Sequence, residues 1–488
     1  MSSMLSFFPT PTLEVCVVAL GIFLLMLEAF LPKLEKFTIG WSAIGGLALV
    51  LALSFFTSNA TSMVSALGFY EADEVGMFFK RFMLVATILT ILLAMDYSRI
   101  FTNFVPAERP NAGLGEFFVL PIFACAGLMW MVTAADFIMI FVALELVTIT
   151  FYILVASMRK NAACLEAGVK YLILGALSTG FLVYGITWIF GGTGQITLST
   201  IAQVLPQLPA SSHTTVLFGL GLVLVALGFK IAAFPFQFWV PDVYQGAPTP
   251  VTAFLSVASK AAGFVVLLRV LDAFLVVPAL SEKIIAILVI LAAATLLYGN
   301  LAALPQTNLK RLLAYSSIAH AGYLLIGVAS VEAGTATNAI VYYLAGYLIM
   351  TFPAFIVLVL VSRATGSDEI SDFNGLAKRS PFLARSLLLS MLSLAGLPFT
   401  MGFLGKFFIF EAAMRSHNYL LVVLGMITVA CGFYYYLKVV RAMYWQPVPD
   451  STVEITVPLG SRVALITLSL ATIVFGIFPA PIFALLGL

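Results

Sequence analysis

The sequence predicts an all-α polytopic membrane protein with about 14 transmembrane helices. Of its 488 residues, 62% are hydrophobic and only 9% are charged, whereas charged residues make up about 25% of an average soluble domain. The mean hydropathy is +1.10. A transmembrane helix needs about 20 predominantly apolar residues, so a chain of this length with short loops has room for about 14 of them. We therefore expect a single transmembrane domain over residues 1–488.

Apolar segments separated by short polar stretches account for nearly the whole chain. In chain order we expect helices near residues 12–31, 40–57, 75–95, 113–132, 135–157, 164–189, 214–240, 249–276, 282–303, 309–330, 334–362, 382–411, 418–445 and 459–485. Lys and Arg are enriched in cytoplasmic loops. With the N-terminus outside, 15 of the 24 Lys and Arg residues lie inside and four lie within the membrane. The five that lie outside are Lys80, Arg81, Arg269, Lys283 and Arg415. We therefore predict that both termini lie outside.

Composition argues against several classes of function. The formal net charge of +2 gives no reason to expect nucleic acid as a partner. The four cysteines lie far apart in apolar segments without a Cys-x-x-Cys pair, so neither zinc nor an iron–sulfur cluster is expected. The glycines at 191–194 do not form a dinucleotide fingerprint, because no strand precedes them. We expect no metal and no bound cofactor in this chain.

Lysines inside the apolar segments are the most informative feature of the sequence. They are Lys170, Lys230, Lys260 and Lys406. A lysine at the centre of the bilayer costs roughly 3 kcal/mol on insertion scales, so four of them indicate a purpose. Groups that gain and lose protons inside a membrane are suited to carrying protons.

The segment 135–157 carries Glu145, which has apolar neighbours on both sides and needs a partner. Lys170 or Lys230 could supply one. Burial lowers the proton affinity of a lone lysine and a nearby carboxylate raises it. A movement of Glu145 would therefore load or unload the proton of a lysine. The alternative is a static ion pair that fixes the register of the helices.

The segment 164–189 places Glu166 four residues before Lys170. This is the favourable order for an ion pair on one face of a helix. A structural pair and a functional pair remain equally open. We expect these two residues to support the other charged groups.

The segment 214–240 should break close to Lys230. Pro235 lacks a backbone donor and clashes with the preceding turn, and Pro241 follows it. The last carbonyls of the first half would then be unpaired, and their partial negative charge would favour an ammonium ion. Many transporters build ion sites at helices broken in this way. The alternative is a kinked structural helix with a chance lysine.

Two further polar residues lie inside the segments that follow. Lys260 has small residues around it in 249–276, which allow close helix packing and leave room for water. A lysine snorkelling from a helix end is the alternative. His320 lies in the middle of 309–330 among serines and a tyrosine. It can relay protons at neutral pH or simply be hydrogen-bonded, and the two readings are equally open.

The segment 382–411 repeats the pattern of Lys230, with Pro398, several glycines and Lys406. We therefore expect a second discontinuous helix near Pro398, and two related halves at about 113–276 and 282–445. The order within the motif differs, because Lys230 precedes its proline and Lys406 follows it. A chance lysine on a kinked helix is the alternative for Lys406.

Three stretches carry a resemblance to a known family. They read LEAGVKYLILGALSTG at 165–180, FPFQFWVPDVYQGAPTPV at 234–251 and LAYSSIAHAGY at 313–323. They resemble the antiporter-like membrane subunits of bacterial proton-translocating NADH–quinone oxidoreductase, respiratory complex I. The first and third point more narrowly to the subunit N family. The resemblance covers nearly the whole chain.

The resemblance implies a 14-helix fold with two inverted five-helix repeats. It also implies the roles of four residues in proton transfer. Glu145 matches the glutamate of the fifth helix, Lys230 the lysine of the seventh, Lys260 the central lysine of the eighth and Lys406 the lysine of the twelfth. The exit position held by Lys406 is a glutamate in some relatives.

The same resemblance implies a place in the bacterial inner membrane, with both termini periplasmic. The neighbours would be the K-type and M-type subunits and the lateral helix of the L-type subunit, together with lipid. NADH, FMN, iron–sulfur clusters and quinone would be bound by partner subunits. The expected function is outward proton translocation coupled to quinone reduction in those subunits. The alternatives are a subunit of a cation/proton antiporter and a structural scaffold whose charges only hold helices together.

Overall fold

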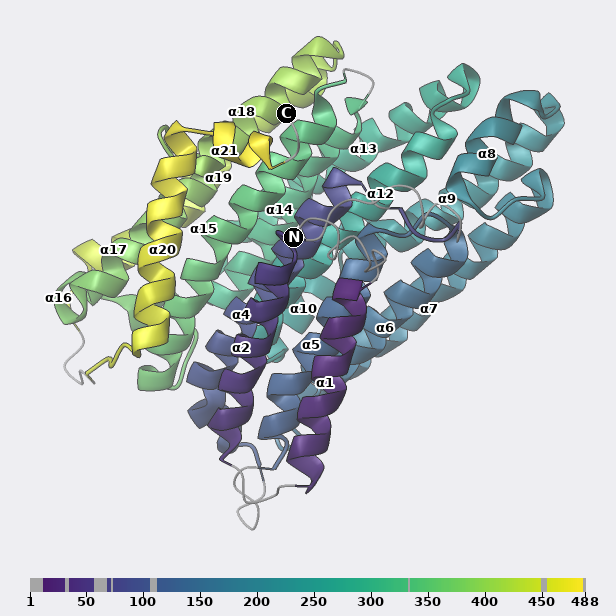
Figure 1. Cartoon of the computed structure of the whole chain (residues 1–488). Helices are drawn as coiled ribbons and strands as arrows, with labels where there is room; N and C mark the ends of the chain where they lie inside the picture. The colour runs from purple at the N-terminus through teal and green to yellow at the C-terminus, as the bar shows by residue number, and fades with distance from the viewer. Residues whose placement is uncertain are drawn as a thin grey trace. The chain divides into compact units, whose positions relative to one another are not determined.

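The computed structural model describes residues 12–30, 35–56, 68–71, 73–105, 112–331, 334–448 and 454–485. These residues are overwhelmingly helical (Figure 1), which confirms the predicted all-α class. The helices of the first half are α1 (Thr12–Phe30), α2 (Lys36–Leu53), α4 (Glu74–Thr102), α5 (Leu114–Val132), α6 (Phe137–Val155), α7 (Ala162–Thr193), α8 (Leu198–Val204), α9 (Ala210–Ile231), α10 (Trp239–Gly246), α11 (Thr249–Phe254) and α12 (Lys260–Phe274).

The second half has the same character. Its helices are α13 (Pro278–Ala303), α14 (Leu309–Val328), α15 (Ala336–Thr365), α16 (Leu376–Arg379), α17 (Pro381–Ala395), α18 (Met401–Arg415), α19 (Tyr419–Trp445), α20 (Leu459–Ile477) and α21 (Ala480–Ala484). The connection between the two halves is short, because α12 ends at Phe274 and α13 begins at Pro278.

Within the described residues, 12 helices are long and apolar enough to cross a membrane. The other two predicted segments take different forms. The residues of α14 are buried almost throughout, so this helix tolerates Lys310, Arg311 and His320 and is less apolar overall. The segment 382–411 is divided between α17 and α18, which have 15 residues each. The prediction of a polytopic helical membrane protein is confirmed.

The chain forms two compact units. The first comprises Met1–Ile91, Phe104–Ile231 and Ala258–Ile284. Within it, α7 and α9 pack closely, because glycines face each other. A Cβ placed on Gly185 would lie 2.6 Å from the carbonyl oxygen of Gly219. Small residues of this kind let helix backbones approach in a membrane.

The second unit comprises Leu92–Asn103, Ala232–Val257 and Ile285–Leu488. Its core is α15, which is buried along its whole apolar window and packs against α17, α18 and α20. A Cβ on Gly402 would lie 1.9 Å from the carbonyl oxygen of Ser393, so α18 touches the backbone of α17.

Both expected helix interruptions are present. Helix α9 ends at Ile231 and α10 begins at Trp239, on either side of Pro235, and the Phe234–Pro235 peptide bond is cis. Helix α17 ends at Ala395 and α18 begins at Met401, on either side of Pro398. The predicted discontinuities near the two prolines are therefore confirmed.

A third interruption was not expected from the sequence. The segment 249–276 contains a π-helical turn at Leu255–Ser259, between α11 and α12. Lys260 is the first residue of α12. Single π turns inside α-helices are rare and often lie at functional sites.

Candidate functional site

The first polar cluster lies in the first unit, where α6, α7 and α9 meet. Thr179 Oγ1 on α7 donates a hydrogen bond of 2.6 Å to Glu145 Oε1 on α6. Lys230 lies in the last turn of α9 and is 5% exposed. Its Nζ makes no hydrogen bond to any described residue. A buried ammonium group without a hydrogen bond is energetically costly, so this position is a candidate functional site.

Thr179 and Lys230 both line a small cavity. Its volume is about 10 Å³, which is close to the minimum that holds one water molecule. The lining residues are Leu144, Thr148, Tyr171, Gly175, Ser178, Thr179, Ala226, Phe229 and Lys230. The hydroxyl groups and the Lys230 ammonium group that line this space make it suitable for a water molecule.

The helix of Lys260 packs directly against Lys230. A Cβ on Gly263 would lie 2.9 Å from Ile231 Cγ2 and 3.3 Å from Lys230 Cγ, so α12 comes close to the Lys230 side chain at this glycine. Gly263 follows Lys260 by three residues on α12. Lys260 is itself buried, with 2% of its surface exposed. The first unit therefore brings Glu145, Lys230 and the helix of Lys260 into one region.

Lys406 lies in the second unit, at the break between α17 and α18. Its Nζ donates hydrogen bonds of 2.9 Å to the Leu394 carbonyl and 2.8 Å to the Ala395 carbonyl. These are the last residues of α17, whose carbonyls have no partner within the helix and carry partial negative charge. The sequence led us to expect this arrangement at Lys230. The structure has it at Lys406, because Lys406 follows its break whereas Lys230 lies on the last turn before its own.

His320 is buried in the second unit between two tyrosine hydroxyls. Its Nδ1 is 2.7 Å from the hydroxyl of Tyr343 and its Nε2 is 3.1 Å from that of Tyr436. The Tyr436 hydroxyl also contacts Ser316. Both ring nitrogens are thus engaged, as a residue that passes a proton from one side to the other requires.

Tyr323 connects His320 with Lys406. Its ring lies 6.1 Å from the imidazole of His320, measured between centroids. Lys406 Nζ lies 5.0 Å from the centre of the same ring, within the range of a cation–π contact. The Tyr323 hydroxyl donates to Thr428 at 3.2 Å. The sequence interpretation noted the tyrosine beside His320, which is Tyr323, but missed Tyr343 and Tyr436. Buried tyrosines recurring in apolar helices were the available signal.

Glu166 and Lys170 form the expected pair. Glu166 Oε1 and Lys170 Nζ lie 2.8 Å apart, but the side chains are 65% and 42% exposed. The helices of this chain therefore do not enclose Lys170. This turn of α7 faces outward together with apolar side chains such as Leu172 and Ile173. The ion pair that the structure gives Lys170 is the one with Glu166.

A fully buried ion pair that the sequence did not reveal lies in the first unit. Lys80 Nζ is 2.8 Å from Glu14 Oε1, and the side chains are 2% and 0% exposed. Tyr70 contacts both groups, donating to Glu14 at 3.3 Å and accepting from Lys80. Burial raises the pKa of the Tyr70 phenol well above its usual range, so the ring stays neutral. Lys80, which the topology counted among outer basic residues, is a buried group.

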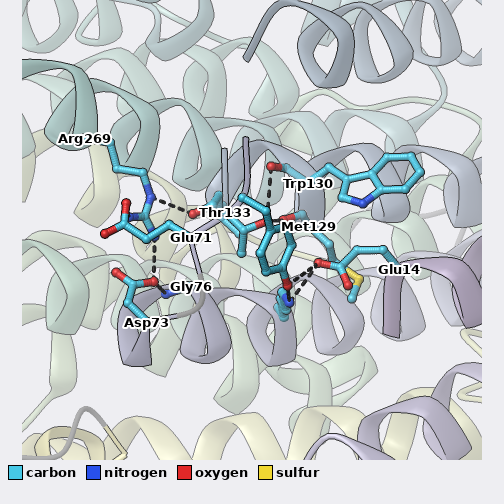
Figure 2. Close-up of polar contacts among 11 residues, drawn as sticks. Glu14, Glu71, Asp73, Gly76, Met129, Trp130, Thr133 and Arg269 are labelled. Carbon is cyan, nitrogen blue, oxygen red and sulfur yellow. Dashed lines mark hydrogen bonds and ion pairs between the residues drawn. The ribbon is translucent and has the colours of Figure 1, made fainter. Parts of the chain in front are cut away.

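Arg269 ties the far end of α12 to the segment that contains Tyr70. Its guanidinium donates to Glu71 at 2.9 Å and to Asp73 at 2.7 Å, and Nε donates to the Val132 carbonyl at 2.8 Å (Figure 2). The Asp73 carboxylate also accepts from the backbone N–H of Gly76 at 2.8 Å. These contacts fix the end of the helix that begins at Lys260.

No group of three or more His, Cys, Asp or Glu residues suited to a metal ion occurs in the part of the chain that the structure describes. The four cysteines are free thiols. The titratable groups that come together inside the helices are carboxylates, lysines, a histidine and tyrosines. Their chemistry is proton transfer and electrostatics.

Replacement of Gly396 by alanine should destabilise the protein by about 1–2 kcal/mol or more. Its backbone has φ 95° and a Cβ would lie 3.2 Å from Lys406 Cδ, so the change adds backbone strain and displaces the lysine. The matched control is Gly194→Ala, where φ is 67° but nothing lies within 4 Å. Thermal denaturation in detergent measures both. A loss no larger than that of Gly194→Ala would contradict crowding at Lys406.

Residues 134–432 match the family model described as NADH:quinone oxidoreductase/Mrp antiporter, transmembrane. The chain is 40% identical over 471 residues to NADH-quinone oxidoreductase subunit N of Moorella thermoacetica, covering 96% of each protein. It is 38% identical over 470 residues to the subunit N of Trichlorobacter lovleyi, covering 96% of this chain and 94% of that relative.

Solved structures agree with these sequence matches. A chain of respiratory complex I from Thermus thermophilus superposes with a TM-score of 0.79 at 32% identity, covering 96% of this chain and 97% of that chain. A chain of the Mrp complex from Dietzia sp. gives a TM-score of 0.79 at 21% identity, covering 98% and 96%. The second match shows a shared fold alone.

Proposed function

Because the chain belongs to the NADH:quinone oxidoreductase/Mrp antiporter family, and within it to subunit N of NADH-quinone oxidoreductase, we propose that it translocates protons as a membrane subunit of that enzyme. Electron transfer from NADH to quinone in other subunits supplies the driving force. The chain contributes the path that protons follow through the membrane.

The burial of three lysines beside interrupted helices carries this proposal. Lys230, Lys260 and Lys406 are each no more than 5% exposed. Each lies at or next to a helix break or a π turn. Intramembrane ionisable residues are costly and are retained where ions or protons move, and broken helices are the usual frame for such sites.

The contacts support a role for each residue. Glu145 modulates the proton affinity of Lys230, with which it interacts electrostatically. Lys260 is the central carrier of the first unit. In the second unit His320 relays protons through its tyrosine partners, and Lys406 is the last carrier before release to the outside.

The redox chemistry belongs to partner subunits in this proposal. NADH, FMN, iron–sulfur clusters and quinone are bound there, and this chain has no redox centre of its own. Its part in the enzyme is that of a proton translocase. The buried carboxylate, lysine, histidine and tyrosine side chains between its helices support this proposal, because such groups exchange protons rather than electrons.

We place the chain in the bacterial inner membrane, with both termini in the periplasm and with K-type and M-type subunits and the lateral helix of the L-type subunit as neighbours. The exposed pair of Glu166 and Lys170 on a membrane helix supports a protein neighbour at α7. A charged pair is less costly against protein than against lipid. In that position the pair supports the charged groups of the path.

Methionine at Lys230 or Lys406 tests the proposal, because it keeps the volume of lysine and removes the charge. We expect each variant to lose at least three-quarters of the protons pumped per NADH oxidised in inverted membrane vesicles. The matched control is Lys283→Met, at an exposed position, which should pump normally. Normal pumping by both core variants would overturn the proposal. Cation-driven proton movement without NADH would instead indicate an antiporter.

A further inference from the structure

We infer that Thr179 positions Glu145 and thereby sets how strongly its carboxylate acts on Lys230. Thr179 is a positioning residue rather than a proton carrier. The inference rests on the proposed function and extends it to a residue that has no charge of its own. The geometry around the carboxylate provides the argument.

The first step concerns the carboxylate. The hydrogen bond from Thr179 is the only one that Glu145 makes to a described residue, and at 2.6 Å it is short. Hydrogen bonds to a charged acceptor are shorter and roughly twice as strong as neutral ones. It joins α6 to α7 across 34 residues of sequence. Thr179 therefore decides on which side of α6 the carboxylate rests.

The second step concerns the lysine. Lys230 Nζ makes no hydrogen bond to a described residue, and the 10 Å³ cavity that it lines is also lined by Thr179. A threonine hydroxyl has one hydrogen to donate, and here Glu145 receives it. Toward the cavity the hydroxyl can only accept. A water molecule in the cavity would donate a hydrogen bond to Thr179. The chain of hydrogen bonds from Lys230 to Glu145 would then run in one direction.

These two steps make Thr179 a restraint. While its hydroxyl holds Glu145, the carboxylate acts on Lys230 without a hydrogen bond to its Nζ. Without the hydroxyl, the carboxylate is free to turn toward Lys230, whose Nζ makes no hydrogen bond to a described residue. A direct ion pair would retain the proton on Lys230 and slow its transfer to the next carrier.

Thr179→Val tests the restraint because valine has the shape of threonine and no hydroxyl. We expect the protons pumped per NADH to fall at least threefold in intact complex, and Thr179→Ser to restore them to within 1.5-fold of the unaltered protein. The matched control is Thr187→Val on the same helix, whose Oγ1 donates at 2.9 Å to the carbonyl of Val183 within α7. It should leave pumping unchanged.

A second measurement does not depend on the valine variant. The carboxylate stretching bands of Glu145, identified by their loss in Glu145→Gln, should shift in D₂O because the bonded hydroxyl proton exchanges. They should shift in the same way in Thr179→Ser. Bands that do not respond to D₂O would overturn the inference even if Thr179→Val failed to assemble.

Glu145→Gln separates this inference from the proposed function. If Thr179 acts through Glu145, Thr179→Val combined with Glu145→Gln should pump no less than Glu145→Gln alone. Reduced pumping in Glu145→Gln together with normal pumping in Thr179→Val would overturn the role of Thr179 and leave the proton path intact. Normal pumping in Glu145→Gln and Lys230→Met would overturn the proposed function itself.

Discussion

Replacement of Lys80 by methionine is expected to destabilise the protein by about 3–5 kcal/mol, the cost of leaving a buried charge without its partner. The residue left behind is Glu14, whose side chain is fully buried. Its second carboxylate oxygen, Oε2, already lacks a hydrogen-bond partner among the described residues. The expected result is a large drop in the thermal denaturation midpoint of the chain within its complex.

Two comparisons make this result specific. Lys80→Met combined with Glu14→Leu should recover most of the loss, because replacing both members of a buried pair by apolar residues is often neutral. Arg415→Met removes a pair of similar length, 2.7 Å to Glu411, whose side chains are 57% and 41% exposed. It should cost less than about 1 kcal/mol. Equal losses in Lys80→Met and Arg415→Met would contradict the importance of burial.

Alanine at Gly402 should have the second large effect. The new Cβ would lie 1.9 Å from the carbonyl oxygen of Ser393, a backbone atom that cannot move aside. Overpacking of this kind typically costs about 1–3 kcal/mol and occasionally more. The change would push α18 away from α17, whose last carbonyls accept hydrogen bonds from Lys406 on α18. Proton pumping should therefore fall together with the denaturation midpoint.

The matched control is Gly180→Ala, on α7, where nothing lies within 4 Å of the added Cβ. Alanine is favoured over glycine inside a helix by about 0.5–1 kcal/mol, so this variant should be neutral or slightly stabilised. A Gly402→Ala protein as stable as Gly180→Ala would show that α17 and α18 are not in backbone contact.

The parts of the fold that depend on local chemistry could be predicted from the sequence. Pro235 and Pro398 break their helices because a proline acts on its own turn, and both breaks are present. The pairing of Glu166 with Lys170 follows from their spacing on one helix and is observed. Whether other helices cover the face of α7 that carries this pair cannot be predicted from the spacing of the two residues.

Long-range partners could not be predicted, because many pairings satisfy the same apolar sequence. Lys80 and Glu14 lie 66 residues apart and could each have been assigned to an end of a helix. The tyrosines that form hydrogen bonds with His320 lie 23 and 116 residues away. Thr179 carries no charge, so nothing in the sequence distinguished it from the other threonines. The proton-transfer roles of the predicted site residues remain predictions.

The π turn at Leu255–Ser259 changes how positions are counted along the helix of Lys260. An α-helix rotates by about 100° per residue, and a π turn closes its hydrogen bond one residue later. Side chains from Lys260 onward are therefore rotated about the helix axis by roughly one residue, about 100°, from the directions that a helical wheel drawn from Thr249 would give. Spin labels or cysteine cross-links in α11 and α12 have to be designed from two separate wheels, one on each side of the turn.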